Sequence, residues 1–118
     1  MPDVHFAPDP PAVDPLEAHA LAQAGGMLLD VREVHEWRGG HAPGALHVPL
    51  GQLPEAVKAL PVDRPIVAVC RSGQRSAAAT AALRQAGYDV VNLTGGMQAW
   101  AAHGLSVVRD DEQPGTVL

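Results

Sequence analysis

The sequence predicts an α/β fold, with a central, mostly parallel sheet and helices on both of its faces. Short apolar runs alternate along the chain with segments of helical pattern, and runs such as PIVAV at Pro65–Val69 are apolar throughout. Strands that alternate apolar and polar residues bury one face, whereas uniformly apolar strands are buried on both. A length of 118 residues and an apolar content of 47% fit a single domain with an ordinary core.

The first half of the chain opens on a Pro-rich lead-in, predicted to be loose over residues 1–12, and the domain is expected to span 13–107. Asp14 is a suitable N-cap, Pro15 suits the first helical position, and Gly25 ends the helix that they begin. The elements predicted next are a buried strand at Met27–Val31, one helical turn at Glu33–Arg38, a brief strand at Leu46–Val48 and a short helix at Leu53–Leu60.

The second half continues the alternation. A strand at Pro65–Val69 leads to a helix at Ser76–Ala86, with Ser76 as its N-cap and Gly87 as its stop. A third clear strand follows at Asp89–Leu93, and GGMQAWAAHG predicts a short helix between glycines. Residues 108–118 are predicted to form a loose acidic tail, because they combine Pro and Gly with Asp110, Asp111 and Glu112.

Charge and composition exclude several classes of function. The formal net charge of −5 argues against nucleic acid as a partner, and no apolar run approaches the roughly 20 residues that a membrane span needs. A single cysteine cannot form an intramolecular disulfide, so a reducing compartment is expected. The N-terminus has neither a basic nor an apolar signal region. The expectation is a cytoplasmic protein without a membrane or nucleic-acid partner.

The segment CRSGQRS, from Cys70 to Ser76, carries the predicted chemistry. Ligands in α/β folds sit at the carboxyl ends of strands, and Cys70 ends a predicted central strand. Gly73 permits a positive φ, so the loop can curl and point its backbone N–H groups into one concavity beside a helix N-terminus. Such a setting favours a nucleophilic thiolate at Cys70. The same loop is expected to bind an anion through Arg71, Ser72, Gly73, Gln74, Arg75 and Ser76.

The plain alternative is that Cys70 is a small buried hydrophobe, as free cysteines commonly are. The adjacent arginine, the glycine within the loop and the helix that starts at once favour the nucleophile. Asp30 and Arg32 end a strand near the same sheet edge. They either orient a loop arginine or, the interpretation we favour, form a structural ion pair.

Two further groups of polar residues are not expected to take part in the chemistry. Glu33 and Glu36 are expected on a solvated short helix. His35, His41 and His47 are regularly spaced, but they cross a Gly-Gly break and a Pro-Gly turn, and no second cysteine or HExxH pattern accompanies them. The sequence therefore predicts no metal and no other cofactor.

Three segments together resemble the single-domain rhodanese family, whose members are thiosulfate sulfurtransferase-like. LLDVREVHEWRGGHAPGALHVPL resembles the first signature of that family, CRSGQRS its active-site loop, and LTGGMQAW its closing G-G-x-x-x-W signature. Any one segment is weak, but three in this order are specific. The resemblance implies five mostly parallel strands with flanking helices.

The resemblance also implies a reaction. A thiolate at Cys70 would attack the outer sulfur of thiosulfate or of another sulfane donor, release sulfite, and pass the persulfide sulfur to cyanide or to a thiol. Related phosphatases have the longer loop Cys-x5-Arg, whereas here Arg75 comes one residue earlier, so sulfur transfer is expected instead of phosphoryl transfer. The alternatives are a persulfide relay or binding module that acts on a partner protein, and a phosphatase-like or arsenate-reducing cysteine enzyme.

Overall fold

The structure is a computed structural model that describes residues 9–118. Its sheet has five parallel strands in the order β1-β5-β4-β2-β3. The strands are β1 (Ala12–Val13), β2 (Met27–Asp30), β3 (Leu46–His47), β4 (Ile66–Val69) and β5 (Val90–Leu93). The helices are α1 (Pro15–Gln23), α2 (Val34–Gly39), α3 (Leu53–Ala56), α4 (Gln74–Gln85) and α5 (Gly96–Ala102), with 3-10 turns η1 (Leu50–Gln52) and η2 (Val57–Ala59). The predicted α/β class and parallel sheet are confirmed.

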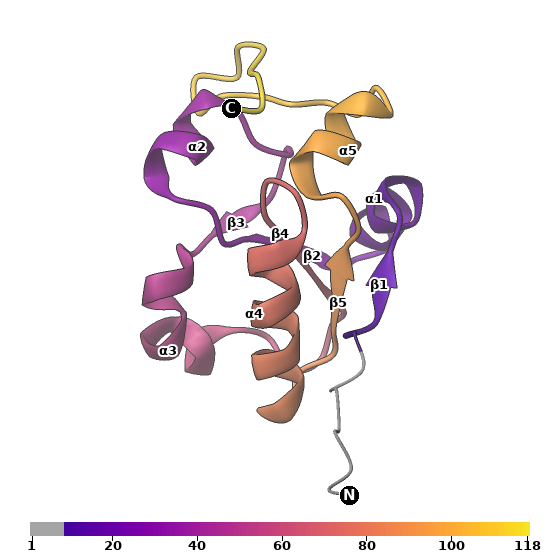
Figure 1. The fold of residues 1–118 in the computed structure, drawn as a ribbon, viewed down its shortest axis with the longest axis vertical. Coiled ribbons are helices and arrows are strands. Elements are labelled where there is room, and N and C mark those ends of the chain that lie inside the picture. The colour runs from indigo at the N-terminus through magenta and orange to yellow at the C-terminus, as the bar shows by residue number, and fades with distance from the viewer. Residues whose placement is uncertain (1–8) are drawn as a thin grey trace, which may run out of the picture.

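Helices cover both faces of this sheet, as the apolar strands predict (Figure 1). β4, at the centre of the sheet, is buried along its whole length. On one face Leu53 of α3 and Leu83 of α4 pack against its residues Ile66 and Ala68. On the other face the core contains Ala18 of α1, Met97 and Trp100 of α5, and Val67 and Val69 of β4. The two cores fix the carboxyl end of β4 between the helices.

The start of the chain differs from the prediction in one respect. Ala12 and Val13 form the edge strand β1, paired in parallel with Asn92 and Leu93 of β5, so the lead-in already contributes to the sheet at its end. Most of the predicted loose lead-in, residues 1–8, lies outside the described residues. A two-residue strand is too short to give a periodic pattern, which is why the sequence did not indicate it.

Helix α4 begins two residues before its predicted start. Its N-cap is Gly73, with φ of 105° in the left-handed region, and its first residue is Gln74. The prediction that Ser76 is the N-cap is therefore wrong, because a glycine at positive φ turns the chain into the helix directly from the loop. Ser76 lies within the helix and is buried. The predicted helix at 53–60 divides into α3 and η2.

The tail that was predicted to be loose, residues 108–118, is ordered together with Val107 against the end of α2 (Figure 1). His41 and Val108 exchange backbone hydrogen bonds of 2.8 and 2.9 Å, and Thr116 N–H donates to Gly39 O at 2.9 Å. Backbone hydrogen bonding does not depend on side-chain pattern, so composition alone gave no sign of this docking. The domain boundaries at 13 and 107 remain a prediction. Among residues 9–118, no helix has the length and apolar character needed to cross a membrane.

Candidate active site

Cys70 directly follows β4 at the carboxyl edge of the sheet, in the loop that leads to α4. The side chain is 1% exposed, so water reaches almost none of it. Two groups contact its sulfur: Gly73 N–H, at the N-cap of α4, donates to Sγ at 3.1 Å, and the hydroxyl of Ser76, in the first turn of α4, lies 3.2 Å from it. The predicted concavity of donors around Cys70 is therefore present.

The pKa of the Cys70 thiol is lowered, although two effects oppose each other. Burial raises the pKa, because it penalises the charged thiolate. Hydrogen bonds from the Ser76 hydroxyl and from the backbone N–H groups of Ser76, Gly73 and Ser72 lower it, and their effect is larger. The main contributions that lower the pKa of Cys70 therefore come from these hydrogen bonds and not from the charges of the loop arginines.

Asn92 of β5 supports both groups that contact the sulfur. Its Oδ1 lies 2.6 Å from the Ser76 hydroxyl, and its Nδ2 donates to Gly73 O at 3.0 Å. A hydroxyl has one proton, so Ser76 donates either to Asn92 or to Cys70 at any one time. Sequence reasoning missed this residue. The available signal was an amide inside the apolar strand DVVNL, because a buried amide requires polar partners.

The N-terminal turn of α5 holds the loop from the opposite side. Met97 N–H donates to Cys70 O at 2.8 Å, and Gln98 N–H donates to Arg71 O at 3.0 Å. A Cβ at Gly96 would lie 2.4 Å from Cys70 O, so only glycine permits this approach. Gly96 also has φ of 59°, which favours glycine. The Gly-Gly turn after β5 thus fixes the backbone of the Cys70 loop.

Arg75 and Glu36 form a two-pronged ion pair between α4 and α2. Nη1 and Nη2 of Arg75 lie 2.7 and 2.8 Å from the two carboxylate oxygens. The hydrogen bond from Arg75 lowers the pKa of Glu36 from 4.5 to about 2, and the same contact raises the pKa of Arg75. The prediction that Glu36 is solvated is wrong: it is 7% exposed, since the pairing with Arg75 satisfies its charge.

Asp30 and Arg32 are buried and pair with each other, with Nη2 of Arg32 2.7 Å from Oδ2 of Asp30. Arg32 also donates to Glu36 O and Gly40 O, at 3.3 and 2.8 Å. Its guanidinium therefore braces α2, and its hydrogen bonds within the described residues go to Asp30, Glu36 and Gly40 instead of to Arg75. These contacts fit the interpretation of Asp30 and Arg32 as a structural ion pair better than the alternative, in which they orient a loop arginine.

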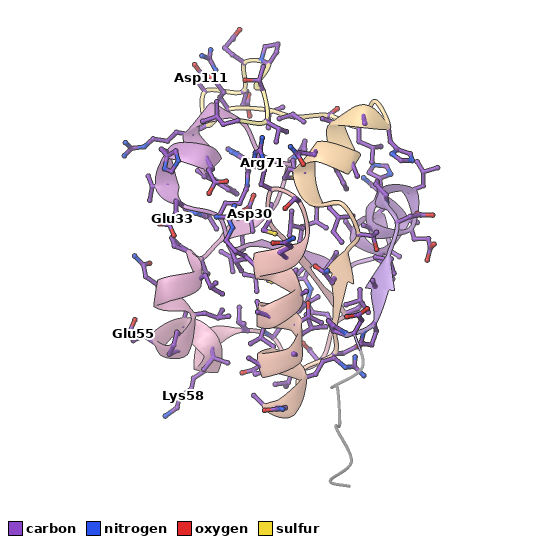
Figure 2. The ribbon with its side chains drawn as sticks, viewed as in Figure 1. Asp30, Glu33, Glu55, Lys58, Arg71 and Asp111 are labelled. Atoms are coloured by element: carbon purple, nitrogen blue, oxygen red, sulfur yellow. The ribbon has the colours of Figure 1, made fainter. Side chains whose placement is uncertain are left out.

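The other loop side chains are arranged around the exterior. Ser72 and Gln74 are exposed, and Arg71 extends toward the C-terminal segment that carries Asp111, farther from the sheet than Asp30 (Figure 2). Arg71 Nε donates to Leu118 O. The loop thus has one arginine engaged by a carboxylate and one, Arg71, on its exposed side.

His41 and His47 have structural contacts. Trp37 stacks on His41 and on His47, with ring centroids 3.6 and 4.7 Å apart. Over residues 9–118, no group of three or more His, Cys, Asp or Glu side chains is arranged to hold a metal ion.

Comparison with known proteins identifies the family. The model of the rhodanese-like domain family matches residues 14–103, which include the strands β2 to β5 and the entire Cys70 loop. The chain belongs to the rhodanese-like domain family. The resemblance found in the three sequence segments is thereby confirmed.

Named relatives of this rhodanese-like domain include sulfurtransferases. The thiosulfate sulfurtransferase GlpE of Stutzerimonas stutzeri (strain A1501) is 34% identical over 102 residues, which cover 86% of this chain and 94% of that protein. A protein named sulfurtransferase of Allochromatium vinosum is 46% identical over 83 residues, covering 70% of this chain and 78% of that protein. The crystal structure of a rhodanese-related protein from Thermoplasma volcanium matches with a TM-score of 0.79 at 33% identity, over 83% of this chain and 97% of the other.

Proposed function

We propose that this rhodanese-like domain is a sulfurtransferase that carries a sulfane sulfur as a persulfide on Cys70. The observation that supports this most strongly is the surroundings of Sγ, in which hydrogen-bond donors of the loop converge on one buried sulfur and lower the pKa of the thiol. A thiolate is the nucleophile that sulfur transfer needs. The relatives named as sulfurtransferases support the general class of reaction.

In the first half-reaction, the Cys70 thiolate attacks the outer sulfur of thiosulfate. The new S–S bond forms as the S–S bond of thiosulfate breaks, and the electron pair of the broken bond leaves with sulfite. The persulfide that remains carries one negative charge. The N–H of Gly73 and the Ser76 hydroxyl, already directed at Sγ, can stabilise that charge without rearrangement of the loop.

In the second half-reaction, an acceptor removes the outer sulfur. Cyanide or a thiolate attacks it, the bond to Cys70 breaks, and the Cys70 thiolate is restored. Cys70 is the only cysteine in the sequence, so no second thiol of this chain can resolve the persulfide. The acceptor is therefore external. This supports a small-molecule thiol or a partner protein equally, and the relay function is the second candidate.

Two features favour sulfur transfer over phosphoryl transfer. The loop has four residues between Cys70 and Arg75, one fewer than in the phosphatase pattern named above. In addition, both Nη atoms of Arg75 are bound to Glu36, so its fork is not free to bind a phosphoryl group in the bidentate manner.

The test is a steady-state assay of thiosulfate with cyanide, in which the product is thiocyanate. We expect turnover by the wild-type protein, none by Cys70→Ser, and negligible hydrolysis of an aryl phosphate. Turnover with a protein or low-molecular-weight persulfide but not with thiosulfate would favour the relay function. Efficient phosphatase activity that is lost in Cys70→Ser would contradict the proposal.

A further inference from the structure

The C-terminal segment, residues 107–118, lies beyond the residues matched by the family and yet reaches the active loop (Figure 1). It runs beside the end of α2, where Val108 pairs with His41 and Thr116 with Gly39. Gly115 N–H donates to Val107 O at 2.9 Å and so closes the segment on itself. The segment is a structured part of the molecule that contacts Arg71 of the loop, although its sequence is that of a tail.

Glycines make the docking of this segment possible. A Cβ at Gly40 would lie 2.7 Å from both Thr116 N and Thr116 O. From the other side, a Cβ at Gly115 would lie 2.7 Å from Gly40 Cα and 2.8 Å from Gly39 O. Gly40 has extended backbone, with φ of 160°, and Gly115 has no positive φ, so neither conformation by itself calls for glycine. At both positions the backbone of the C-terminal segment lies directly against the backbone at the end of α2. Because glycine has no Cβ, Gly40 and Gly115 permit this close approach.

The segment and α5 together hold Arg71. Leu118 O accepts a hydrogen bond from Nε of Arg71. With the Gln98 amide turned so that its oxygen faces the guanidinium, this oxygen lies 3.2 and 3.1 Å from Nη1 and Nη2. A guanidinium has five N–H groups. These contacts use three of them, which leaves one N–H on each terminal nitrogen for a ligand.

Arg71 also differs from the other loop arginine in its charge balance. Arg75 is neutralised by the carboxylate of Glu36. Within the described range 9–118, by contrast, no Asp or Glu side chain forms an ion pair with Arg71. Arg71 follows Cys70 directly in the chain. It is therefore the loop arginine that no carboxylate side chain of the described residues neutralises.

From these contacts we propose that the C-terminal segment 107–118 is part of the donor-binding site, because it holds Arg71 so that its two remaining N–H groups bind the anionic oxygens of the sulfur donor. This inference rests on the proposed sulfur transfer. A free arginine side chain loses rotamer freedom when it binds, whereas a held guanidinium has already lost it. As the donor's S–S bond breaks and sulfite leaves with the electron pair, the same N–H groups stabilise its oxygens.

The test undocks the segment without altering Arg71. Gly115→Ala and Gly40→Ala each place a methyl group against backbone atoms of the docked arrangement, from opposite sides. Gly51→Ala is the matched control, because no atom lies within 4 Å of its Cβ position and Gly51 has no positive φ. Hydrogen exchange at the Thr116 amide reports whether the segment has left Gly39 O.

Binding of thiosulfate is measured by calorimetry in Cys70→Ser protein, which cannot react, and KM and kcat are measured with Cys70 intact. We expect undocking to weaken thiosulfate binding and raise its KM by about tenfold, the scale of one hydrogen bond to a charged group. The kcat at saturation and the pH profile of Cys70 alkylation should not change. The monoanion methanethiosulfonate, which has one charge fewer than thiosulfate, should be affected less. Arg71→Ala should weaken thiosulfate binding to the same extent. Adding Gly115→Ala to Arg71→Ala should weaken it no further.

Unchanged or tighter thiosulfate binding in an undocked variant would overturn the inference, and tighter binding would mean that the segment competes with the donor for Arg71. Unchanged binding in Arg71→Ala would overturn it whether or not the glycine variants undock. Failure of the proposed function gives a different result: the wild-type protein would then form no Cys70 persulfide from any donor, even if thiosulfate binding responds to Arg71.

Discussion

Replacing Glu36 by Gln tests the ion pair that joins α2 to α4, the helix that follows the Cys70 loop. Lowering the pKa of Glu36 from 4.5 to about 2 corresponds to about 3 kcal/mol in favour of the folded, charged state. The Arg75 side chain is 36% exposed, so solvent screens the pair and we reduce the expected loss for Glu36→Gln to about 1–2 kcal/mol at pH 7. The melting temperature should fall by roughly 4–8 °C.

The effect should depend on pH with a definite sign. A carboxyl whose pKa is lower in the folded state stabilises the fold above its unfolded pKa, and this contribution is lost as pH falls through the folded pKa. The difference between wild type and Glu36→Gln should therefore be complete above about pH 5 and shrink as pH falls from 4.5 toward 2. Urea unfolding at several pH values measures it, with Glu55→Gln, an exposed carboxylate on α3, as the control.

A difference that is absent at pH 7, or equal at pH 3.5 and pH 7, would refute this reasoning. A double-mutant cycle with Arg75→Ala gives a second check. Because each residue acts through the other, the double variant should lose less stability than the two single losses added together.

Three other substitutions have definite expected results. Ser76→Ala removes a donor to Sγ, about 1.5–3 kcal/mol for a charged acceptor, so alkylation of Cys70 should shift to higher pH; an unchanged profile would exclude Ser76 as a thiolate donor. Gly96→Ala forces the loop away from α5 and should reduce kcat/KM by about 100-fold, whereas wild-type activity would show that the loop tolerates the shift. Asp30→Asn breaks a buried ion pair and should cost about 3 kcal/mol in unfolding experiments; a loss below about 1 kcal/mol would mean that the pair is dispensable.

The parts of the fold that could be predicted from the sequence depend on the pattern of apolar residues and on the glycines and prolines that end helices and strands. The runs that became β2, β4 and β5 are uniformly apolar or nearly so, and glycines stand near the helix ends that they were predicted to mark. The position and the turn of the Cys70 loop were predictable for the same reason, because Cys70 follows such a run and Gly73 permits the turn.

The parts that were missed depend on partners far away in the sequence. A glutamate such as Glu36 is normally expected at the surface. Its burial is explained only by the ion pair with Arg75, which comes 39 positions later in the chain. The role of Asn92 follows only from its hydrogen bonds with Ser76 and Gly73, which the sequence does not show. The C-terminal segment docks through backbone hydrogen bonds, which have no sequence signature. Ser76 was assigned to the helix start because its type suits an N-cap, but its hydroxyl is used by Cys70 and Asn92 instead.

The central claim, that Cys70 carries the transferred sulfur, is tested most directly by intact-protein mass spectrometry after incubation with thiosulfate and removal of excess donor. The account predicts a mass gain of one sulfur atom, located at Cys70 by fragmentation, released by cyanide and absent in Cys70→Ser. A wild-type protein that remains unmodified with thiosulfate and with persulfide donors, while its Cys70 still reacts with an alkylating agent, would contradict it.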